Sequence, residues 1–422
     1  MSNTPQTALV IGSGIIGAAS AYALAKAGVK VTLVDQGAYG SGCSHANCGY
    51  VSPSHVLPLC VPGAIAKTMK FALRPNSPFR IAPSLDFKLW KFLAQFALNC
   101  DDAKAVPAGH ARKAMIERST VLYKQFLAHE NLDCQWEDKG CIFTNETAEG
   151  FRGYSAYVAQ LQNTFQQEGW VKLEGDDLVK YEPAIKPGTL AGGWLFKGDA
   201  QMKPDQLMAC YKTALLRLGV VIRENTPVTG LRTAGGRTVA AQVTVDGKKG
   251  EIAADAFVVA TGAWAPFLSK DLGFQVPIQP GKGYSITMTR PAICPATPLI
   301  FQDVKVAISP FKDAYRIGSL MEFAGYDTSM KEQRLQLLRD GAARYLREPL
   351  GGQVTEQWYG WRPMTPTGKP VIGFAPAAAN LVVAAGHNME GMCMGAATGE
   401  MVMELLTGQK TTVESGAFAV GG

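Results

Sequence analysis

The feature that most constrains the fold of this chain is a glycine-rich turn between a short apolar run and a helical segment near the N-terminus. Residues 8–11 are apolar and typical of a buried parallel strand. The spacing Gly12-x-Gly14-x-x-Gly17 follows, and residues 18–26 are good helix formers. This order predicts a strand, a tight turn and a helix, which together form the first half of a nucleotide-binding unit.

A second β-branched run, residues 31–34, ends at Asp35 and completes a βαβ unit. In such a unit Gly12 permits the sharp turn, Gly14 lets backbone N–H groups approach a pyrophosphate, and Gly17 lets the helix pack closely on the strand. The helix N-terminus offers partial positive charge, and Asp35 accepts hydrogen bonds from ribose hydroxyls. The chain is therefore expected to bind a dinucleotide. The alternative is a glycine-rich turn that serves packing alone.

A second candidate strand bears on the identity of the cofactor. Residues 256–260 form a buried apolar run that ends in Thr261-Gly262, and such a late strand lies beside the first strand in flavoproteins. No second Gly-x-Gly-x-x-Gly motif follows Gly17, so a separate nicotinamide site is not expected. One dinucleotide that is held permanently favours FAD over NAD. A buried core strand with an ordinary turn is the alternative interpretation of residues 256–264.

Composition excludes several classes of protein. The chain has 422 residues, of which 47% are hydrophobic and 18% charged, so it can bury large cores and is expected to form two or three domains. The formal charge of +6 is spread thinly, which disfavours a nucleic-acid partner. Nine cysteines without a Cys-x-x-Cys pair predict reduced thiols and no metal site. The start of the chain lacks a signal sequence, and prolines and lysines interrupt the apolar stretch 56–73, so a cytoplasmic protein is expected.

Several motifs further along the chain carry a resemblance to a known family. They are Ser44-His45-Ala46-Asn47-Cys48-Gly49-Tyr50-Val51-Ser52-Pro53, the helical region 85–101, Pro280-Gly281-Lys282-Gly283-Tyr284-Ser285, the run 360–373 that begins Gly360-Trp361-Arg362-Pro363-Met364-Thr365-Pro366, and Gly386-His387. These motifs resemble the D-amino acid oxidase superfamily of flavoproteins nearly end to end, and most closely its D-amino acid dehydrogenase branch. Two positions depart from that branch: Thr367 replaces the usual Asp, and residues 388–393 replace Gly-Thr-Leu-Gly-Trp-Thr.

The resemblance implies an α/β fold in which a Rossmann-type FAD-binding domain is interleaved with an α+β substrate domain built on a mixed or antiparallel sheet. The FAD-binding domain is expected from residues 1–57, 200–270 and 346–422, and the substrate domain from residues 58–199 and 271–345. Strands of the second sheet are expected near 140–144, 283–289, 304–309 and 315–320. Residues 147–167 and 330–346 are predicted to be helical from their apolar spacing.

The same resemblance assigns the candidate site residues. Arg362 matches the family's carboxylate-binding Arg, whose planar fork binds a carboxylate at two points, and the alternative is a structural pair with an acid such as Glu356. Tyr284 and Tyr326 are further candidates for the same carboxylate. No side chain is expected to act as a catalytic acid or base, because the flavin carries the chemistry. The residues expected to bind the cofactor are Gly12, Gly14, Ile15, Ile16, Gly17, Asp35, Gln36, Ser44, Asn47, Gly49, Val228, Thr261, Gly262, Trp264, Gly360, Gly386, Gly391 and Met392.

A few further residues have two interpretations. Lys282 either faces the flavin or closes a turn. His45 lies in the loop that runs along the flavin, but it is displaced by one residue from the His that carries covalent FAD in some relatives, so non-covalent FAD is expected. His387 is expected to pack at its turn, since hydride transfer leaves it no proton to move. The cysteines 43, 48 and 393 are expected to be small buried side chains without a redox role.

The activity implied by the resemblance is FAD-dependent oxidation of a D-amino acid to a 2-oxo acid and ammonia, with electrons passed to a quinone-type acceptor or an electron-transfer partner. One alternative is an O2-using oxidase or dehydrogenase of glycine, an N-substituted glycine or a D-proline-like substrate such as hydroxyproline. Another is a catalytically idle FAD-binding subunit or sensor, which the intact motif around Arg362 argues against.

A membrane surface is a candidate partner for the helical region. Leu85, Leu89, Phe92, Leu93 and Phe96 fall at helical spacing, and nearby cations are Lys67, Lys70, Arg74, Arg80, Lys88 and Lys91. This pattern is consistent with peripheral contact on the inner face of the cytoplasmic membrane. The alternative is an amphipathic helix packed on its own domain with a solvated basic face.

Overall fold

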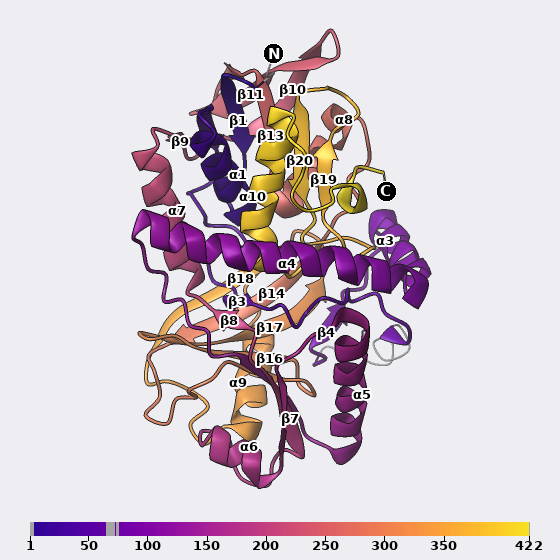
Figure 1. Ribbon diagram of the computed structural model, residues 1–422, viewed down its shortest axis with the longest axis vertical. Helices are drawn as coiled ribbons and strands as arrows, with labels where there is room; N and C mark the ends of the chain where they lie inside the picture. The colour runs from indigo at the N-terminus through magenta and orange to yellow at the C-terminus, as the bar shows by residue number, and fades with distance from the viewer. Residues whose placement is uncertain (1–3, 65–71, 73–75, 422) are drawn as a thin grey trace.

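The first of two large sheets is built around the predicted βαβ unit. The computed structural model, which describes residues 4–64, 72 and 76–421, gives this sheet the strand order β19-β20-β13-β1-β2-β9 (Figure 1). Its strands are β1 (Thr7–Ile11), β2 (Lys30–Val34), β9 (Val221–Arg223), β13 (Ala256–Val259), β19 (Val371–Phe374) and β20 (Leu381–Ala385). β1 pairs in parallel with both β2 and β13, whereas β19 runs antiparallel to β20. Segments that are far apart in the sequence therefore meet at the first strand.

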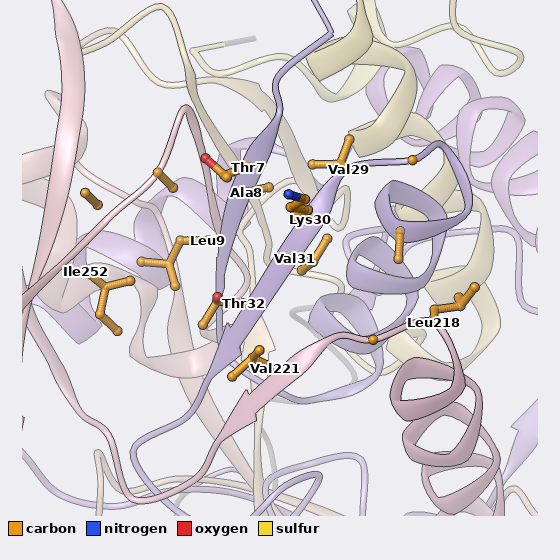
Figure 2. A pocket seen from close by; sticks show the side chains of 15 residues that line it. Thr7, Ala8, Leu9, Val29, Lys30, Val31, Thr32, Leu218, Val221 and Ile252 are labelled. Carbon is orange, nitrogen blue, oxygen red and sulfur yellow. The ribbon is translucent and has the colours of Figure 1, made fainter.

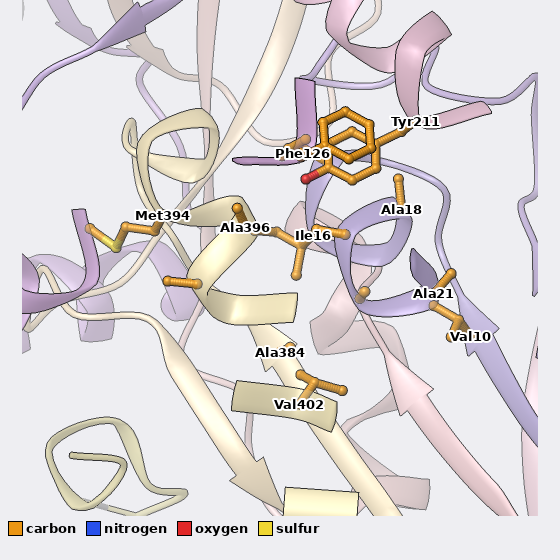
Figure 3. Packing of buried hydrophobic residues seen from close by; sticks show 14 of the residues in the cluster. Val10, Ile16, Ala18, Ala21, Phe126, Tyr211, Ala384, Met394, Ala396 and Val402 are labelled. Carbon is orange, nitrogen blue, oxygen red and sulfur yellow. The ribbon is translucent and has the colours of Figure 1, made fainter. Parts of the chain in front are cut away.

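Side chains on the two faces of β1 pack into separate cores. Ala8 and Val10 belong to a cluster with α1 (Ile15–Lys26), α4 (Asp102–Glu130), α7 (Pro204–Arg217) and α10 (Gly391–Thr407), part of which Figure 3 shows. Leu9 and Ile11 pack on the other side with an antiparallel sheet of β10 (Val228–Ala234), β11 (Arg237–Val245) and β12 (Lys248–Ala253). This arrangement explains why residues 8–11 of the strand are all apolar.

The last long helix lies directly against the first one, because two of its residues are glycine. A Cβ on Gly399 would lie 2.5 Å from the backbone carbonyl of Ala19, and a Cβ on Gly395 would lie 2.7 Å from a side-chain carbon of Ile15. Residues four apart share one face of a helix, so both glycines meet α1. The N-terminus of α10 is thereby held beside the N-terminus of α1.

The second sheet has nine strands in the order β18-β14-β17-β16-β15-β5-β7-β6, with β4 beside β17. They are β4 (Phe79–Ile81), β5 (Cys141–Asn145), β6 (Trp170–Glu174), β7 (Gly192–Phe196), β14 (Gln279–Met288), β15 (Leu299–Phe301), β16 (Val306–Pro310), β17 (Tyr315–Phe323) and β18 (Val354–Met364). The β15–β5 and β17–β4 pairs are parallel, and the other pairs are antiparallel. The sheet is therefore mixed.

Helices cover both faces of the second sheet, which lies in the lower half of Figure 1. α9 (Glu332–Tyr345) packs in one core with Tyr284 and Ile286, and α5 (Ala148–Phe165) packs in another with Phe143. Further elements are α6 (Asp176–Tyr181), α8 (Ser269–Leu272), the 3-10 helices η1 (Gly262–Leu268) and η2 (Gly416–Phe418), and the strand pair β3 (Tyr50–Val51) with β8 (Ala200–Gln201). The predicted fold class, a Rossmann-type unit combined with a mixed sheet, is confirmed. The division into domains stays a prediction, although β18, from the last expected FAD-binding segment, pairs with β14 in the second sheet.

The helix with the predicted membrane pattern is α3 (Phe87–Leu98), and its inner and outer faces both carry apolar residues. Leu89 and Phe92 of the predicted stripe are buried, whereas Phe87 and Trp90 are exposed on the other side. The cations Lys67, Lys70 and Arg74 lie outside the described residues. Among the helices that the structure describes, none is long and apolar enough to cross a membrane.

Candidate active site

The turn between β1 and α1 is so tightly packed that two of its motif positions require glycine. Gly12 has a φ of +101°, and a Cβ there would lie 2.5 Å from the carbonyl oxygen of Ala260. A Cβ on Gly17 would overlap the carbonyl oxygen of Gly12. The turn and the end of β13 therefore form one continuous backbone surface beyond the carboxyl ends of parallel strands, which is where nucleotides bind in such sheets.

The acidic residue at the end of β2 holds this turn in shape. One carboxylate oxygen of Asp35 accepts hydrogen bonds from the backbone N–H of Ser13 at 2.7 Å and from its hydroxyl at 2.9 Å. The other oxygen accepts from the N–H of Gly37 at 2.9 Å. Since an ionised carboxylate has about four acceptor positions, Asp35 retains acceptors for ribose hydroxyls. Its neighbour Gln36 is exposed.

A buried hydroxyl at the opposite side of the turn fits a bound dinucleotide. Thr261 Oγ1 is buried and has no hydrogen-bond partner among the residues that the structure describes, and the Cα of Thr261 lies over Gly12. A buried polar atom without a partner is uncommon and is explained when a ligand supplies the missing contact. At the start of α1 the side chains of Ile15 and Ile16 are buried, and the N–H of Ile15 donates to Ser44 Oγ at 2.9 Å. These residues fit the FAD predicted from the sequence.

The loop of residues 43–53 is fastened to one face of the second sheet. Ser285 Oγ donates to the carbonyl of Ala46, and Ser309 Oγ to that of Cys48, each at 2.7 Å. Arg316 Nη1 donates to the carbonyl of Asn47 at 2.7 Å. These bonds from three strands join the expected cofactor loop to the expected substrate domain.

Two residues shape this loop from within. Asn47 Oδ1 accepts from the N–H of Gly49 at 2.9 Å. Gly49 has a φ of +70°, and a Cβ there would overlap the carbonyl oxygen of Met202. The loop can therefore pass between Met202 and the sheet only with glycine at this position.

Glu356 is paired with His45, which decides how Arg362 is to be interpreted. His45 Nε2 lies 2.7 Å from Glu356 Oε1, and this hydrogen bond raises the pKa of His45 above its ordinary value despite partial burial. Arg316 Nη2 lies 3.9 Å from the second oxygen of Glu356. The structural pair of Arg362 with Glu356, considered as an alternative from the sequence, is therefore not formed.

The guanidinium of Arg362 is partly buried and has no carboxylate partner within 4 Å in the part of the chain that the structure describes. It lies over Gly283 of β14, where a Cβ would overlap it. Nη1 donates to the carbonyl of Leu320 at 2.6 Å, and Nη2 to that of Ser319 at 3.4 Å. Burial lowers the pKa of Arg362, opposed by the nearby thiols of Cys43 and Cys48. The site thus places a cation beside the cofactor loop and leaves several of its five N–H donors available for an anion.

Two predicted substrate contacts lie elsewhere. Tyr284 points to the opposite face of β14 from Gly283, because side chains alternate along a strand, and its hydroxyl donates to Glu322 Oε2 at 2.7 Å. This placement puts the phenol of Tyr284 on the face of the sheet opposite the Arg362 guanidinium. The hydroxyl of Tyr326 donates to the carbonyl of Ala263 at 2.6 Å, and not toward Arg362.

Lys282 and Trp264 are also occupied by contacts within the protein. Lys282 is fully buried on the same face as Tyr284, and its ammonium donates to the carbonyls of Asp327 and Ser329. It therefore secures the segment after β17 and does not face Arg362. The ring of Trp264 meets that of Trp361 edge to face, with centroids 5.4 Å apart.

The turn that begins at Gly386 and contains the start of the altered stretch 388–393 is closed by Asn388. Its Oδ1 accepts from the N–H of Thr365 at 2.9 Å, and its Nδ2 donates to the carbonyl of Gly386 at 2.9 Å. His387 Nε2 lies 2.9 Å from Thr398 Oγ1, and burial lowers the pKa of His387 to about 3. His387 is therefore neutral at physiological pH and packs at the turn, in agreement with the sequence-based expectation.

The remaining predicted cofactor residues lie around the same region. Gly391 is the first residue of α10, and the carbonyl of Met392 accepts from Tyr123 Oη at 2.7 Å. Val228 begins β10, two residues after Thr226, whose N–H donates to the carbonyl of Asp35 at 2.7 Å. A Cβ on Gly14 would lie 3.3 Å from Ser44 Oγ, and a Cβ on Gly360 would overlap the ring of Trp358. Gly262 has a φ of +54°.

Three contributors to the site were missed by the sequence analysis. Ser13 occupies an unspecified position of the glycine motif, but its N–H and hydroxyl both donate hydrogen bonds to Asp35 and so join that residue to the turn. Ser319 and Leu320 have φ values of +119° and +59°, an uncommon conformation for residues other than glycine, and nothing in their sequence announces it. Gly281 and Gly283 are two residues apart in a strand, so they lie on the same face of the sheet. This spacing could have indicated that the face carries no side chains from β14 at these positions.

A separate cavity of about 440 Å³ lies at the other end of the first sheet (Figure 2). Its lining includes Thr7, Lys30 and Val221, which begin β1, β2 and β9. Ligands of parallel sheets bind at the carboxyl ends of the strands, so this cavity at the amino ends is distinct from the cofactor site.

The chain is similar to known flavoproteins over nearly its whole length. Residues 7–405 match a family model, DAO, described as FAD dependent oxidoreductase. The D-amino acid dehydrogenase of Xanthobacter autotrophicus is 32% identical, with 98% of each chain covered, and that of Vibrio vulnificus is 29% identical, with 97% of this chain and 98% of the relative covered.

Solved structures share the fold. Glycine oxidase from Geobacillus kaustophilus superposes with a TM-score of 0.74 at 24% sequence identity, and the match covers 98% of each chain. L-proline dehydrogenase from P. horikoshii superposes with a TM-score of 0.70 at 19% sequence identity, and the match covers 97% of this chain and 95% of the other. The glycine turn, the buried Thr261 hydroxyl without a partner among the described residues, and the family match all indicate the same cofactor. The chain belongs to the DAO family of FAD-dependent oxidoreductases, and it is an enzyme whose cofactor is FAD.

Proposed function

We propose that this enzyme oxidises a D-amino acid to the imino acid, which water converts to a 2-oxo acid and ammonia, and that a quinone receives the electrons. The observation that carries the proposal is the partly buried guanidinium of Arg362, which has no carboxylate partner among the described residues. A cation that is partly withdrawn from water is stabilised by a counter-ion, so a substrate carboxylate is its natural complement. The names of the relatives, D-amino acid dehydrogenase, support the same substrate class.

The protein's task in this reaction is to bind and orient. The chemistry that FAD would supply when bound is acceptance of a hydride from the substrate Cα, and the amine would lose a proton to give the imine. Arg362 fixes the carboxylate at two points, which restricts the substrate to one orientation. The imine then takes up water and releases ammonia, and two electrons with two protons convert the quinone to the quinol. No side chain of the protein has to supply an acid or a base.

FAD is proposed to be non-covalent, held by the backbone of the Gly12 turn, by Asp35 and Thr261, and by the loop around Asn47. His45 is the nearest candidate for a covalent link. Its Nε2 lies 2.7 Å from Glu356 Oε1, so this ring nitrogen is occupied by a contact within the protein. The contact therefore supports retention of FAD without a covalent bond.

The environment of Arg362 favours an apolar substrate side chain. Met321 Sδ lies 3.9 Å from Nη1, and the nearby thiols of Cys43 and Cys48 have pKa values raised by burial. Neutral thiols and a thioether offer no partner to a charged side chain. We expect D-alanine-like and larger apolar substrates to be preferred over D-aspartate or D-lysine.

The test is an anaerobic panel of D-, L- and N-methyl amino acids, with loss of the flavin absorbance near about 450 nm as the readout. We expect bleaching by apolar D-amino acids and slow or absent bleaching by their L-forms. Bleaching by L-forms alone would overturn the stereochemical proposal. Absence of bleaching by any amino acid would favour the idle subunit.

The second candidate is an O2-using oxidase of glycine, an N-substituted glycine or a D-proline-like substrate. It is favoured by the replaced turn at 388–393, where Asn388 and buried Glu390 change the surroundings from the dehydrogenase pattern. Hydrogen peroxide formed in air at the rate of substrate turnover would support this candidate. Turnover that requires an added quinone would support the dehydrogenase.

We also propose that α3 docks the enzyme on anionic lipid, where a lipid-soluble quinone is found. Phe87, Trp90 and Leu98 follow one exposed helical face with exposed fractions of 79%, 52% and 72%, and Leu85 just before the helix is fully exposed. Lys88 and Lys91 are exposed beside them. Exposed aromatic residues flanked by lysines suit the interface of an anionic membrane.

A Phe87→Ser/Trp90→Ser double variant is expected to lose at least about tenfold in binding to phosphatidylcholine–phosphatidylglycerol vesicles, because two large apolar side chains no longer insert. Cosedimentation measures the bound fraction. Leu216→Ser, which changes an exposed residue of α7, is the matched control and should bind as the wild type. Equal binding of the double variant and the wild type would exclude α3 as the docking surface.

A further inference from the structure

The inference concerns the face of the second sheet that lies opposite Arg362, and it rests on the proposed function. Glu322 of β17 is fully buried there. Its carboxylate accepts from Tyr284 Oη at 2.7 Å, from Arg80 Nη1 at 2.7 Å and from Lys331 Nζ at 3.0 Å. These donors come from β14, from β4 and from the segment before α9. One carboxylate therefore joins three separate elements to β17.

Glu322 lies two residues beyond an irregular stretch of β17. Ser319 and Leu320 both have positive φ, and the pairing of β14 with β17 shifts register between Lys282 and Tyr284, directly opposite this stretch. L-residues rarely adopt such a conformation unless the surrounding structure enforces it. Irregular backbone of this kind is most often found at functional sites, so its consequence should be sought nearby.

The consequence is the orientation of the Arg362 side chain. The irregular stretch turns the carbonyls of Ser319 and Leu320 toward the guanidinium, which donates to both. On the other side of the sheet, Glu322 is ionised: burial acts to raise its pKa, but the hydrogen bonds from Tyr284 and Lys331 outweigh this and lower it. A charged carboxylate with three donors is a firm attachment point.

We propose that Glu322 is a positioning residue for substrate binding: it fixes β17 just beyond the irregular stretch, so that two backbone carbonyls hold the Arg362 guanidinium in the orientation that receives a carboxylate. Tyr284, which the sequence placed at the substrate, contributes instead from behind the sheet. Its phenol and the guanidinium act on the same strand from opposite faces, without contact between them.

Lys331 ties this arrangement to the following segment. It lies 2.9 Å from Asp327 Oδ2 as well as 3.0 Å from Glu322, and Lys282 donates to the carbonyls of Asp327 and Ser329. The segment 327–331 is therefore bound to β14 and β17 together. Loss of Glu322 removes the link that lies closest in sequence to Ser319 and Leu320.

The test measures carboxylate binding by the holoenzyme, with propionate as the probe and calorimetry as the readout. For Glu322→Gln, whose amide keeps the shape but loses the charge, we expect the Kd for propionate and the KM for the amino acid to rise about tenfold. The kcat at saturating substrate should stay within about twofold, and FAD content should be unchanged. Tyr284→Phe removes one donor and should raise the same Kd about threefold, which tests the proposal even if Glu322→Gln fails to fold.

Glu182→Gln is the matched control. Glu182, at the end of α6, is also a buried carboxylate, and it accepts hydrogen bonds from the N–H groups of Ala296 and Thr297. Among the described residues, no hydrogen bond or ion pair joins its side chain to β17. Glu182→Gln should lower the melting temperature without raising the Kd for propionate. If Glu322→Gln and Tyr284→Phe also leave that Kd unchanged, or if kcat falls while Kd and KM do not move, the positioning role is overturned.

The outcome is separable from that of the proposed function. Propionate binding requires no turnover, so it reports on Arg362 even if no amino acid bleaches the flavin. In that case the proposed function fails, and a raised Kd in Glu322→Gln still supports the positioning role. Bleaching by D-amino acids together with an unchanged Kd in both variants would overturn the positioning role alone.

Discussion

Replacing Arg362 with Met is expected to lower kcat/KM for the amino-acid substrate by about a thousandfold while the protein retains FAD. Removing one partner of a buried, hydrogen-bonded charge pair costs about 2–5 kcal/mol, and about 1.4 kcal/mol corresponds to a tenfold change. The carbonyls of Ser319 and Leu320 also lose their donor. Steady-state kinetics give the loss, and the flavin absorbance of the purified protein gives the cofactor content.

Arg362→Lys distinguishes the charge of the side chain from its geometry. Lysine keeps the cation but cannot form two parallel hydrogen bonds to one carboxylate, so KM should rise by about 10- to 100-fold with kcat less affected. Propionate binding should weaken in the same order: wild type, Lys variant, Met variant. A Met variant with the KM of the wild type would remove Arg362 from the carboxylate site, and loss of FAD would show instead that the residue supports the cofactor domain.

The parts of the site that could be predicted from the sequence are those set by local pattern. The Gly12 turn, α1 and the strand ending at Asp35 lie within one short stretch, and glycine spacing together with apolar runs is sufficient to define them. Arg362 was found through a long motif. Its lack of a carboxylate partner among the described residues could not be predicted from the sequence. Glu356, the candidate partner, pairs instead with His45, which is more than 300 residues away in sequence.

What could not be predicted from the sequence also has a physical cause. Tyr284 is adjacent in sequence to Gly283, but neighbours on a strand face opposite sides of the sheet, and the sequence does not say which side carries the site. For α3 the spacing of Leu89 and Phe92 predicts an apolar face correctly. The outer face carries Phe87 and Trp90 as well, so apolar spacing alone cannot tell which side is covered by the protein. Both questions are decided by tertiary contacts between distant segments.

The second large effect is expected at the first glycine of the motif. Gly12→Ala should yield protein that is folded but purifies without FAD, because two independent constraints are violated. The φ of +101° is strained for alanine, and the new Cβ would lie 2.5 Å from the carbonyl oxygen of Ala260. Relief requires the turn or the end of β13 to move, and both belong to the surface that receives the dinucleotide. The ratio of flavin absorbance to protein absorbance measures the loss.

Gly28→Ala is the control that separates strain from collision. Gly28 also has a positive φ, +85°, but a Cβ there has no atom within 4 Å, and the residue ends α1 at the far side from the cofactor. It should therefore cost about 1 kcal/mol of stability or somewhat more and leave FAD content at the wild-type level. FAD retained equally in both variants would mean that close contact between the turn and β13 is not needed for binding. FAD lost equally in both would mean that general destabilisation, and not the shape of the turn, governs cofactor retention.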